Sequence, residues 1–500
     1  MEGRLAKGNR KPVKGNRKPI KGNRKPVKGH TPAGDSQRQS PGLSKGDRVE
    51  AEVVDIGHKG DAVARYKGLT IFSDRGIPGD SILVSVESVG KSFVKGKTEE
   101  ITTPSKDRTT GFCQEGSACG GCQLGEMSYE AQVDWKTRRV RAAVERIGGL
   151  SPRLVEETLP APEGARLHYR NKALFRVTPS GDFALRAGFL ESGSGRVAAV
   201  DSCAVVSRLI ERVKSAVLEE VVGRQGLAAG LRGLLIRSNS PETAAMLVLI
   251  YGGKLNTEAT ALLAPLARAV SARVPELSSV YVNVVPAGAV DVTLPGRLEL
   301  VWGSGWMEQE LAGVCLRYGP RSFFQVNPLQ AETLVDLARK FSSGGTLLDI
   351  YCGVGLFGLS LASDFQRVIG IESAPEAVAE AVGNAALNGI SKVSFRRGRA
   401  EQVLPHLSVE LKEEDGGHLG GLTAIVDPPR SGCSAELLES IAAHQVGTVI
   451  YVSCDPATLA RDLEVLVSLG YETRVVQPVD MFPQTIHVEM VAQLYFNGKR

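Results

Sequence analysis

From about residue 322 onward, short apolar runs alternate with stretches of helical periodicity. Strands that alternate with helices form a mainly parallel sheet that is covered by helices on both faces. The apolar runs that predict these strands fall at residues 346–351, 368–372, 393–397, 422–427 and 448–452. Two more runs, 472–476 and 488–496, predict two antiparallel strands at the end of the chain. The pattern therefore predicts a doubly wound, Rossmann-like α/β fold, whose ligands bind at the carboxyl ends of the strands.

The segment from residue 45 to 104 has a different pattern, because its apolar runs are short and are separated by glycines. Several short strands with turn signals between them predict a small, OB-like β-barrel. Residues 105–321 contain further β-rich runs, which predict a central α+β domain. With residues 1–44 before the barrel and 322–500 forming the α/β domain, we expect the chain to have four parts.

Residues 127–147 predict a helix with one apolar and one basic face, ended by two glycines. The apolar stripe consists of Tyr129, Val133, Val140, Val144 and Ile147. The basic face consists of Lys136, Arg138, Arg139 and Arg141. We interpret the basic face as solvated, and contact with RNA is the alternative.

Length and composition limit the class of protein. A chain of 500 residues with 42% hydrophobic and 23% charged residues is too long for one core and is typical of a soluble globular protein. No apolar run approaches the roughly 18 residues that cross a bilayer, and the basic N-terminus lacks the apolar segment of a secretory signal. We therefore expect a cytoplasmic protein, monomeric and without a membrane or protein partner. Cysteines rarely form disulfides in that compartment, so clustered ones indicate metal binding or catalysis.

Positive charge is concentrated in the first 44 residues, which hold twelve Lys and Arg but only two acids, Glu2 and Asp35. A seven-residue unit, Gly-Asn-Arg-Lys-Pro-(Val/Ile)-Lys, starts at Gly8, Gly15 and Gly22. Gly and Pro in every copy prevent a continuous helix, and the apolar residues are too few to form a core. We predict a disordered tail that binds RNA or DNA through its charge. A solvated appendage without a required role is the alternative.

Three cysteines lie close together in the sequence, at Cys113, Cys119 and Cys122, with glycines between them. Glycines allow the backbone to wind tightly around a metal centre and to direct N–H groups toward sulfur. Cys203 is the candidate fourth ligand. Three local thiols and one distant thiol favour a [4Fe-4S] cluster, whereas zinc sites more often pair two Cys-x2-Cys units. Zinc and chance burial stay open as alternatives.

A glycine-rich motif follows the first strand of the α/β domain. Asp349 ends that strand, and Gly353, Gly355 and Gly358 form a Gly-x-Gly-x-x-Gly that enters a helix. Glu372 ends the second strand, where a carboxylate can accept hydrogen bonds from both ribose hydroxyls of a bound nucleoside. These residues fit S-adenosylmethionine, but a dinucleotide site has the same pattern.

Three further groups are predicted at the same edge of the sheet. Asp427 begins Asp-Pro-Pro-Arg after the fourth strand, Cys454 follows the fifth strand in Ser-Cys-Asp-Pro, and Glu489 precedes the last strand. Taken alone, Cys454 is better explained as an inert core thiol. Together with a methyl donor, the three groups fit methylation of uracil C5. In that reaction a thiolate attacks C6, the methyl group goes to C5, and a base removes the C5 proton.

In this order, the motifs resemble those of the RNA 5-methyluridine methyltransferase family. They comprise 322–327 (Ser-Phe-Phe-Gln-Val-Asn), the Asp349 glycine loop, 427–430, 453–456, and 482–485 with Glu489. The resemblance spans residues 45–500 and implies that Gln325, Glu372 and Asp427 contact or flank S-adenosylmethionine. It also implies that Cys454 is the nucleophile and Glu489 the base, that the barrel is a TRAM domain that binds RNA, and that a [4Fe-4S] cluster is structural or contacts RNA. A barrel combined with a cluster favours 23S ribosomal RNA as substrate, with transfer RNA as the alternative.

Two details depart from the family pattern, and two rival functions stay open. Gly398 is followed by Arg399 where many relatives have an acid, so Glu401 is the candidate replacement, and residues 408–421 form an acidic, Gly-rich insertion. Cytosine-C5 methyltransferases use the same attack on C6, but their thiol follows the fourth strand, where this chain has none. A non-catalytic RNA-binding protein leaves Cys454 and Glu489 unexplained. We interpret His487 as a core or hydrogen-bonding residue and not as a metal ligand.

Overall fold

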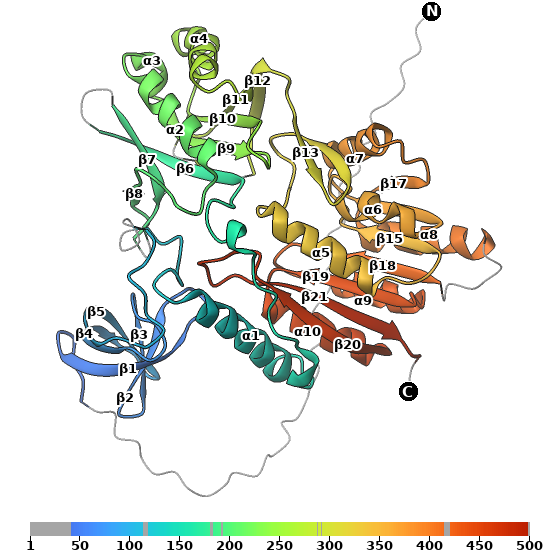
Figure 1. Cartoon of the computed structure of the whole chain (residues 1–500), viewed down its shortest axis with the longest axis horizontal. Coiled ribbons are helices and arrows are strands. Elements are labelled where there is room, and N and C mark those ends of the chain that lie inside the picture. The colour runs from blue at the N-terminus through green and yellow to red at the C-terminus, as the bar shows by residue number, and fades with distance from the viewer. Residues whose placement is uncertain are drawn as a thin grey trace, which may run out of the picture. The chain divides into compact units, whose positions relative to one another are not determined.

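The computed structural model describes residues 42–113, 119–180, 184–191, 194–287, 289–291, 293–414 and 421–498 (Figure 1). The repeat tail up to residue 41 and residues 415–420 of the acidic insertion lie outside these ranges, so their predictions stay untested. Among the described residues, none of the helices combines the length and the hydropathy that crossing a bilayer requires.

Five strands form a closed barrel in the order β1-β2-β3-β5-β4. Side chains alternate between buried and exposed along β1, because successive residues of a strand point to opposite faces. Closure leaves no free sheet edge. The small barrel expected from the glycine-punctuated runs is thus confirmed. Its strands are β1 (Arg48–Ile56), β2 (Ala62–Tyr66), β3 (Leu69–Ser73), β4 (Ser81–Val89) and β5 (Phe93–Thr103).

The central region contains a seven-stranded sheet in the order β12-β11-β10-β9-β6-β7-β8. Apolar side chains of α2 and α4 pack on one face of this sheet in a shared core. The strands are β6 (Lys172–Pro179), β7 (Leu185–Leu190), β8 (Val197–Ala199), β9 (Leu231–Ser238), β10 (Ala245–Gly252), β11 (Leu277–Val285) and β12 (Arg297–Gly303), and the helices are α2 (Arg208–Val221), α3 (Gln225–Ala228) and α4 (Thr257–Arg273). A hairpin of β13 (Met307–Leu311) and β14 (Val314–Tyr318) follows.

The C-terminal sheet has the order β17-β16-β15-β18-β19-β21-β20, with β15 to β19 parallel and the last two strands antiparallel. Leu347 faces one core and its neighbour Leu348 faces the other, so both faces are covered, as the doubly wound prediction requires. The strands are β15 (Thr346–Ile350), β16 (Arg367–Glu372), β17 (Val393–Arg397), β18 (Leu422–Val426), β19 (Thr448–Ser453), β20 (Tyr471–Val479) and β21 (Glu489–Phe496). The helices are α5 (Pro328–Phe341), α6 (Leu356–Ser360), α7 (Pro375–Leu387), α8 (Ala400–Glu414), α9 (Ala435–Ala443) and α10 (Pro456–Ser468).

Helix α1 (Tyr129–Arg146) lies between the barrel and the central sheet in the sequence, yet it packs against α10 and β20 of the C-terminal sheet (Figure 1). The predicted assignment of its faces is wrong at two positions. Lys136, expected on a solvated basic face, is fully buried, and Ile147, expected on the apolar stripe, is 44% exposed. The physical reason is that Lys136 finds a buried carboxylate in the C-terminal segment.

Candidate active site

Strand register brings Cys454 and Glu489 together. Strands β19 and β21 pair antiparallel, and Ser453 lies opposite Met490. One position beyond this pair, Cys454 continues from β19 and Glu489 begins β21. Opposed residues of antiparallel strands have Cα atoms about 5 Å apart. Two residues that are distant in the sequence therefore lie side by side at one edge of the sheet.

Burial controls the ionisation of both groups. Cys454 is half-buried, and its pKa is raised to about 12 by burial and by the negative charge of Glu489, although Arg430 acts in the opposite direction. Glu489 is 4% exposed, and its pKa is raised well above the ordinary value by burial and then by Asp427. Both shifts favour the uncharged forms in the free protein, a thiol at Cys454 and a protonated carboxyl at Glu489.

The turn that carries Cys454 is held by the start of α10. The Asp455 side chain accepts hydrogen bonds from the N–H groups of Ala457 and Thr458, at 3.0 and 2.9 Å, and Pro456 occupies the first helical turn. This is the strand, turn and helix that the sequence pattern predicts. The half-buried thiol consequently projects from a turn that is fixed on both sides.

A buried network fixes the neighbouring loop after β18. The Tyr451 hydroxyl donates to Asp462 at 2.5 Å, and the same carboxylate accepts from the Cys433 amide at 2.9 Å. Arg461 also donates to the Ser431 carbonyl at 2.9 Å. Helix α10 thus supports both the Cys454 turn and the segment that follows Asp427, a role the sequence reading did not assign.

The glycine loop follows β15 as expected. The Gly358 amide donates to Asp349 Oδ2 at 2.8 Å, and the other oxygen of this buried carboxylate has no hydrogen-bond partner. Gly355 has a φ of 95°, in the left-handed region that favours glycine. Burial raises the pKa of Asp349 to about 7. Asp349 therefore fixes the backbone of the loop through its hydrogen bond with the Gly358 amide.

Glu372 lines a cavity of about 390 Å³ at the carboxyl ends of the strands. Its carboxylate accepts from the Gly353 amide at 3.2 Å, which ties the ends of β15 and β16 together. Arg399 and Glu401 line the same cavity and form an ion pair, with Arg399 Nε 2.6 Å from Glu401 Oε1. Arg399, which departs from the family pattern, is thus paired with the Glu401 carboxylate in the lining of this cavity.

The other predicted cofactor residues are not part of the lining of that cavity. Gln325 is 6% exposed, and its backbone carbonyl accepts from Asn171 at 2.9 Å. Asp427 is half-buried after β18, and its pKa is raised to about 7 by burial and by Asp349. The structure therefore brings Asp427, Cys454 and Glu489 within electrostatic reach of one another, while Gln325 belongs to a separate segment before α5.

The four cysteines singled out in the sequence line one small cavity of about 60 Å³ together with apolar groups, Arg170 and Thr485. Burial and then the neighbouring Cys203 raise the pKa of Cys122 to about 12. No group of three or more His, Cys, Asp and Glu residues in the described part of the chain is arranged to hold a metal ion. The two observations are compatible, because side chains can line one cavity and still stand too far apart to bind one metal ion.

Sequence reasoning missed the residues that hold the segment before Glu489. Lys136 and Gln132 of α1 bond to this segment, which connects β20 to β21. A signal was available, because Lys136 lies three residues after Val133 and four before Val140 and so falls on the apolar stripe. His487 of the same segment is half-buried with its ring 5.9 Å from that of Phe482, and its pKa is lowered to about 4 by burial and nearby cations such as Arg430.

A family model described as tRNA (uracil-5-)-methyltransferase matches residues 128–495. The chain belongs to this family. An uncharacterized RNA methyltransferase of Halalkalibacterium halodurans is 36% identical over 471 residues, which cover 92% of this chain and 99% of that protein. One from Caldanaerobacter subterraneus is 34% identical over 457 residues, with 89% and 98% covered.

Among solved structures, the tRNA (uracil-54, C5)-methyltransferase of Pyrococcus abyssi, in complex with S-adenosyl-L-homocysteine, has a TM-score of 0.68. It is 26% identical and covers 89% of this chain and 100% of its own. The chain of 500 residues is thus an S-adenosylmethionine-dependent RNA methyltransferase, which confirms the predicted family and enzyme class.

Gly358→Ala tests the glycine loop. A Cβ at this position would lie 2.9 Å from Asp349 Oδ2 and 3.2 Å from Val368 Cγ1, so the loop must move. We expect the affinity for S-adenosylhomocysteine to fall about tenfold, or about 1.4 kcal/mol, by isothermal titration calorimetry. Gly383→Ala on α7 is the matched control, because nothing lies within 4 Å of its Cβ. Equal affinities in both variants would contradict this account of the loop.

Asp427→Asn tests the burial of charge. Because the pKa of Asp427 is raised from 3.8 to about 7 in the folded protein, the unfolded state loses this proton first. The carboxyl therefore destabilises the fold increasingly as the pH rises between these two values, and the effect levels off above the folded pKa. The melting temperature of the variant, relative to the unchanged protein, should therefore increase by a few degrees between pH 5 and pH 8, as differential scanning fluorimetry can show. Asp134→Asn, at a side chain that is 61% exposed, should show no such trend.

Proposed function

We propose that this methyltransferase methylates C5 of a uridine in RNA through a covalent bond between Cys454 and uracil C6. The observation that supports the proposal most strongly is the register of β19 and β21, which sets Cys454 beside Glu489. Asp427 and the glycine loop lie at the same edge of the sheet. A nucleophile, a base and a donor site at one edge are the groups that this reaction needs.

The Cys454 thiol releases its proton to solvent, and the thiolate sulfur attacks C6 of the uracil, which places a negative charge on C5 and the C4 oxygen. Arg430 favours the thiolate, because its positive charge lowers the pKa of Cys454. S-adenosylmethionine, when bound, supplies the methyl group that C5 takes up. Glu489 in its ionised form then removes the C5 proton, and the bond between sulfur and C6 breaks, which restores the C5–C6 double bond and releases the Cys454 thiolate. The proton taken up by Glu489 passes to this thiolate, which restores the thiol and the ionised carboxylate.

Residues at the strand ends would hold the donor. We propose that Glu372, which lines the cavity after β16, accepts hydrogen bonds from the ribose hydroxyls of the donor. Gly353 and Gly355, both with positive φ, would contact the donor through the backbone of the loop. Asp349 orients the loop through the Gly358 amide. Gln325 and Asp427 flank the donor in this proposal. Since Glu401 lines the cavity and pairs with Arg399, it is the candidate contact on the adenine side.

The target base must leave its stack to reach Cys454, because C6 of a stacked pyrimidine is inaccessible. We propose that the barrel of β1 to β5 is a TRAM-type module that binds the flanking RNA. Barrel and cysteines together favour 23S ribosomal RNA as substrate. The similarity to the Pyrococcus abyssi enzyme, which acts on transfer RNA, is the specific observation that favours the second candidate, transfer RNA.

We also propose that Cys113, Cys119, Cys122 and Cys203 hold a [4Fe-4S] cluster. The supporting observation is that soft thiols from two distant segments line one cavity with apolar neighbours such as Phe112. Each thiolate of such a cluster binds a different iron, so the sulfurs stand farther apart than around one zinc ion. The cluster would cross-link the segment before α1 to the central domain and takes no part in methyl transfer.

The proposed reaction is tested by incubating the protein with a labelled methyl donor and unmodified ribosomal or transfer RNA. We expect label in 23S ribosomal RNA, as 5-methyluridine by mass spectrometry. Cys454→Ser should lower the rate by at least about 10³-fold, because the attack on C6 requires the sulfur. Label only in transfer RNA would contradict the proposal of 23S ribosomal RNA as substrate, but it would still agree with the proposed reaction mechanism. Full activity of Cys454→Ser would overturn the chemistry.

The cluster is tested by colour. Protein purified without oxygen should be brown and contain about four irons, and Cys119→Ser should abolish the visible absorption. Cys315→Ser is the matched control, since this half-buried cysteine lies on β14, away from the cavity, and should keep the colour. A colourless preparation that contains zinc would contradict the choice of metal.

A further inference from the structure

The segment 480–488, here called the β20–β21 loop, connects the two antiparallel strands at the active-site edge. Val479, the last residue of β20, pairs with Glu489, the first residue of β21. The position of Glu489 therefore depends on how the loop between these two residues is held. Asp480 follows Val479 directly and is fully buried.

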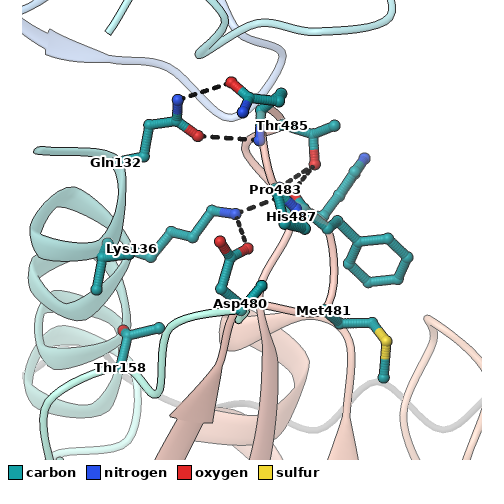
Figure 2. A network of polar contacts seen from close by, with 12 residues as sticks. Gln132, Lys136, Thr158, Asp480, Met481, Pro483, Thr485 and His487 are labelled. Carbon is teal, nitrogen blue, oxygen red and sulfur yellow. Dashed lines mark hydrogen bonds and ion pairs between the residues drawn. The ribbon is translucent and has the colours of Figure 1, made fainter. Parts of the chain in front are cut away.

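Helix α1 supplies a positive charge to this loop. Lys136 Nζ forms an ion pair with Asp480 and donates to the Phe482 carbonyl at 3.0 Å (Figure 2). Both side chains of the ion pair are completely buried. Tyr129, two turns earlier on α1, donates to the second oxygen of Asp480 at 2.7 Å. Both carboxylate oxygens are thus bonded, as a buried charge requires.

Gln132 holds the same loop by two hydrogen bonds. Its side chain accepts from the Gln484 amide at 2.9 Å and donates to Gln484 Oε1 at 2.8 Å. Gln484 has a φ of 72°, a strained value for a residue with a side chain. The Leu124 amide also donates to the Gln484 carbonyl, at 3.0 Å. A strained conformation persists only where such contacts enforce it.

The opposite side of the loop is bonded as well, and α1 joins it to the barrel. Gln330 of α5 donates to the Asp480 carbonyl at 2.9 Å, and Tyr169 donates to the Pro483 carbonyl at 3.1 Å. Trp135 of α1 donates to Asp55 of β1 at 2.8 Å. One apolar cluster contains residues of the barrel, of α1 and of the loop, namely Ile56, Ile77, Leu124, Met127, Trp135 and Ile486.

We propose that Lys136 and Gln132 are positioning residues, which hold the β20–β21 loop so that Glu489 meets the C5 proton. This inference rests on the proposed function. Neither residue touches the substrate, and each acts through the loop. A displacement of about 1 Å at a reacting group costs roughly 10²-fold in rate. Releasing the loop should therefore slow the step that Glu489 performs while leaving binding intact.

That step has a signature of its own. Cys454 is bound to C6 from the first attack until Glu489 removes the C5 proton, so a misplaced base lets the covalent protein–RNA adduct accumulate. The adduct survives denaturing electrophoresis, whereas general destabilisation lowers adduct and product together. Glu489→Gln, which lacks the base, defines the fully trapped state.

The experiment compares Lys136→Met, Gln132→Met, Glu489→Gln and the unchanged protein on unmodified RNA under single-turnover conditions. For both α1 variants we expect the ratio of adduct to product to rise at least about tenfold and product formation to fall roughly 10²-fold. KM values for RNA and methyl donor should change less than about threefold. Arg138→Met is the matched control on α1, because its ion pair with Asp134 is exposed, and it should match the unchanged protein.

Rates and adduct ratios like those of the unchanged protein in both α1 variants would overturn the inference. Loss of product without adduct, in variants that still bind S-adenosylhomocysteine and RNA, would overturn it too. If Lys136→Met does not fold, Gln132→Met decides alone, because it leaves no buried charge unpaired. Absence of adduct in Glu489→Gln itself would instead overturn the proposed function, so the two failures are distinguishable.

Discussion

The site depends on the antiparallel pairing of β21 with β19. The parallel strands β15 to β19 direct their carboxyl ends to one edge and supply the donor loop, Glu372, Asp427 and Cys454, but not Glu489. A strand that runs the other way begins at that edge. Glu489 is the first residue of β21, so it lies beside Cys454 without any long connection over the sheet. The proximity of the proposed nucleophile, at the end of one strand, and the proposed base, at the start of its neighbour, is thus a direct result of topology.

Electrostatics at this edge follow from burial. Burial raises the pKa of Asp349 and of Asp427 to about 7, with Glu372 adding to the shift of Asp349 and Asp349 to that of Asp427. Asp427 in turn adds to the raised pKa of Glu489. The positive charge of Arg430 partly opposes the rise in the pKa of Cys454. Asp480 lies one residue beyond the same sheet edge, but its charge is matched by Lys136. The proposed base and its acidic neighbours therefore differ from Asp480, whose charge is compensated by a buried ion pair.

Much of the fold was readable from hydrophobic periodicity. The apolar runs at 346–351 and 448–452 became β15 and β19, and Pro456 began α10, because buried parallel strands and helix starts have strong local signals. Lys136 was misassigned because its partner, Asp480, is distant in the sequence, and a local pattern counts every lysine as polar. The pairing of Arg399 with Glu401 and the support of the Cys433 loop by Asp462 also depend on tertiary contacts. Local patterns were thus sufficient to select the candidate site residues, whereas the tertiary contacts that hold them could be seen only in the structure.

The most direct test of the account is to identify the residue that bonds to RNA. RNA with 5-fluorouridine in place of uridine carries fluorine where the C5 proton would be, so Glu489 cannot complete the reaction and the adduct persists. Protease digestion and tandem mass spectrometry then locate the modified residue. We expect one modified peptide, with the methylated fluorouridine nucleotide on Cys454. A modification on another cysteine, or no adduct with RNA that is methylated in its uridine form, would contradict the account.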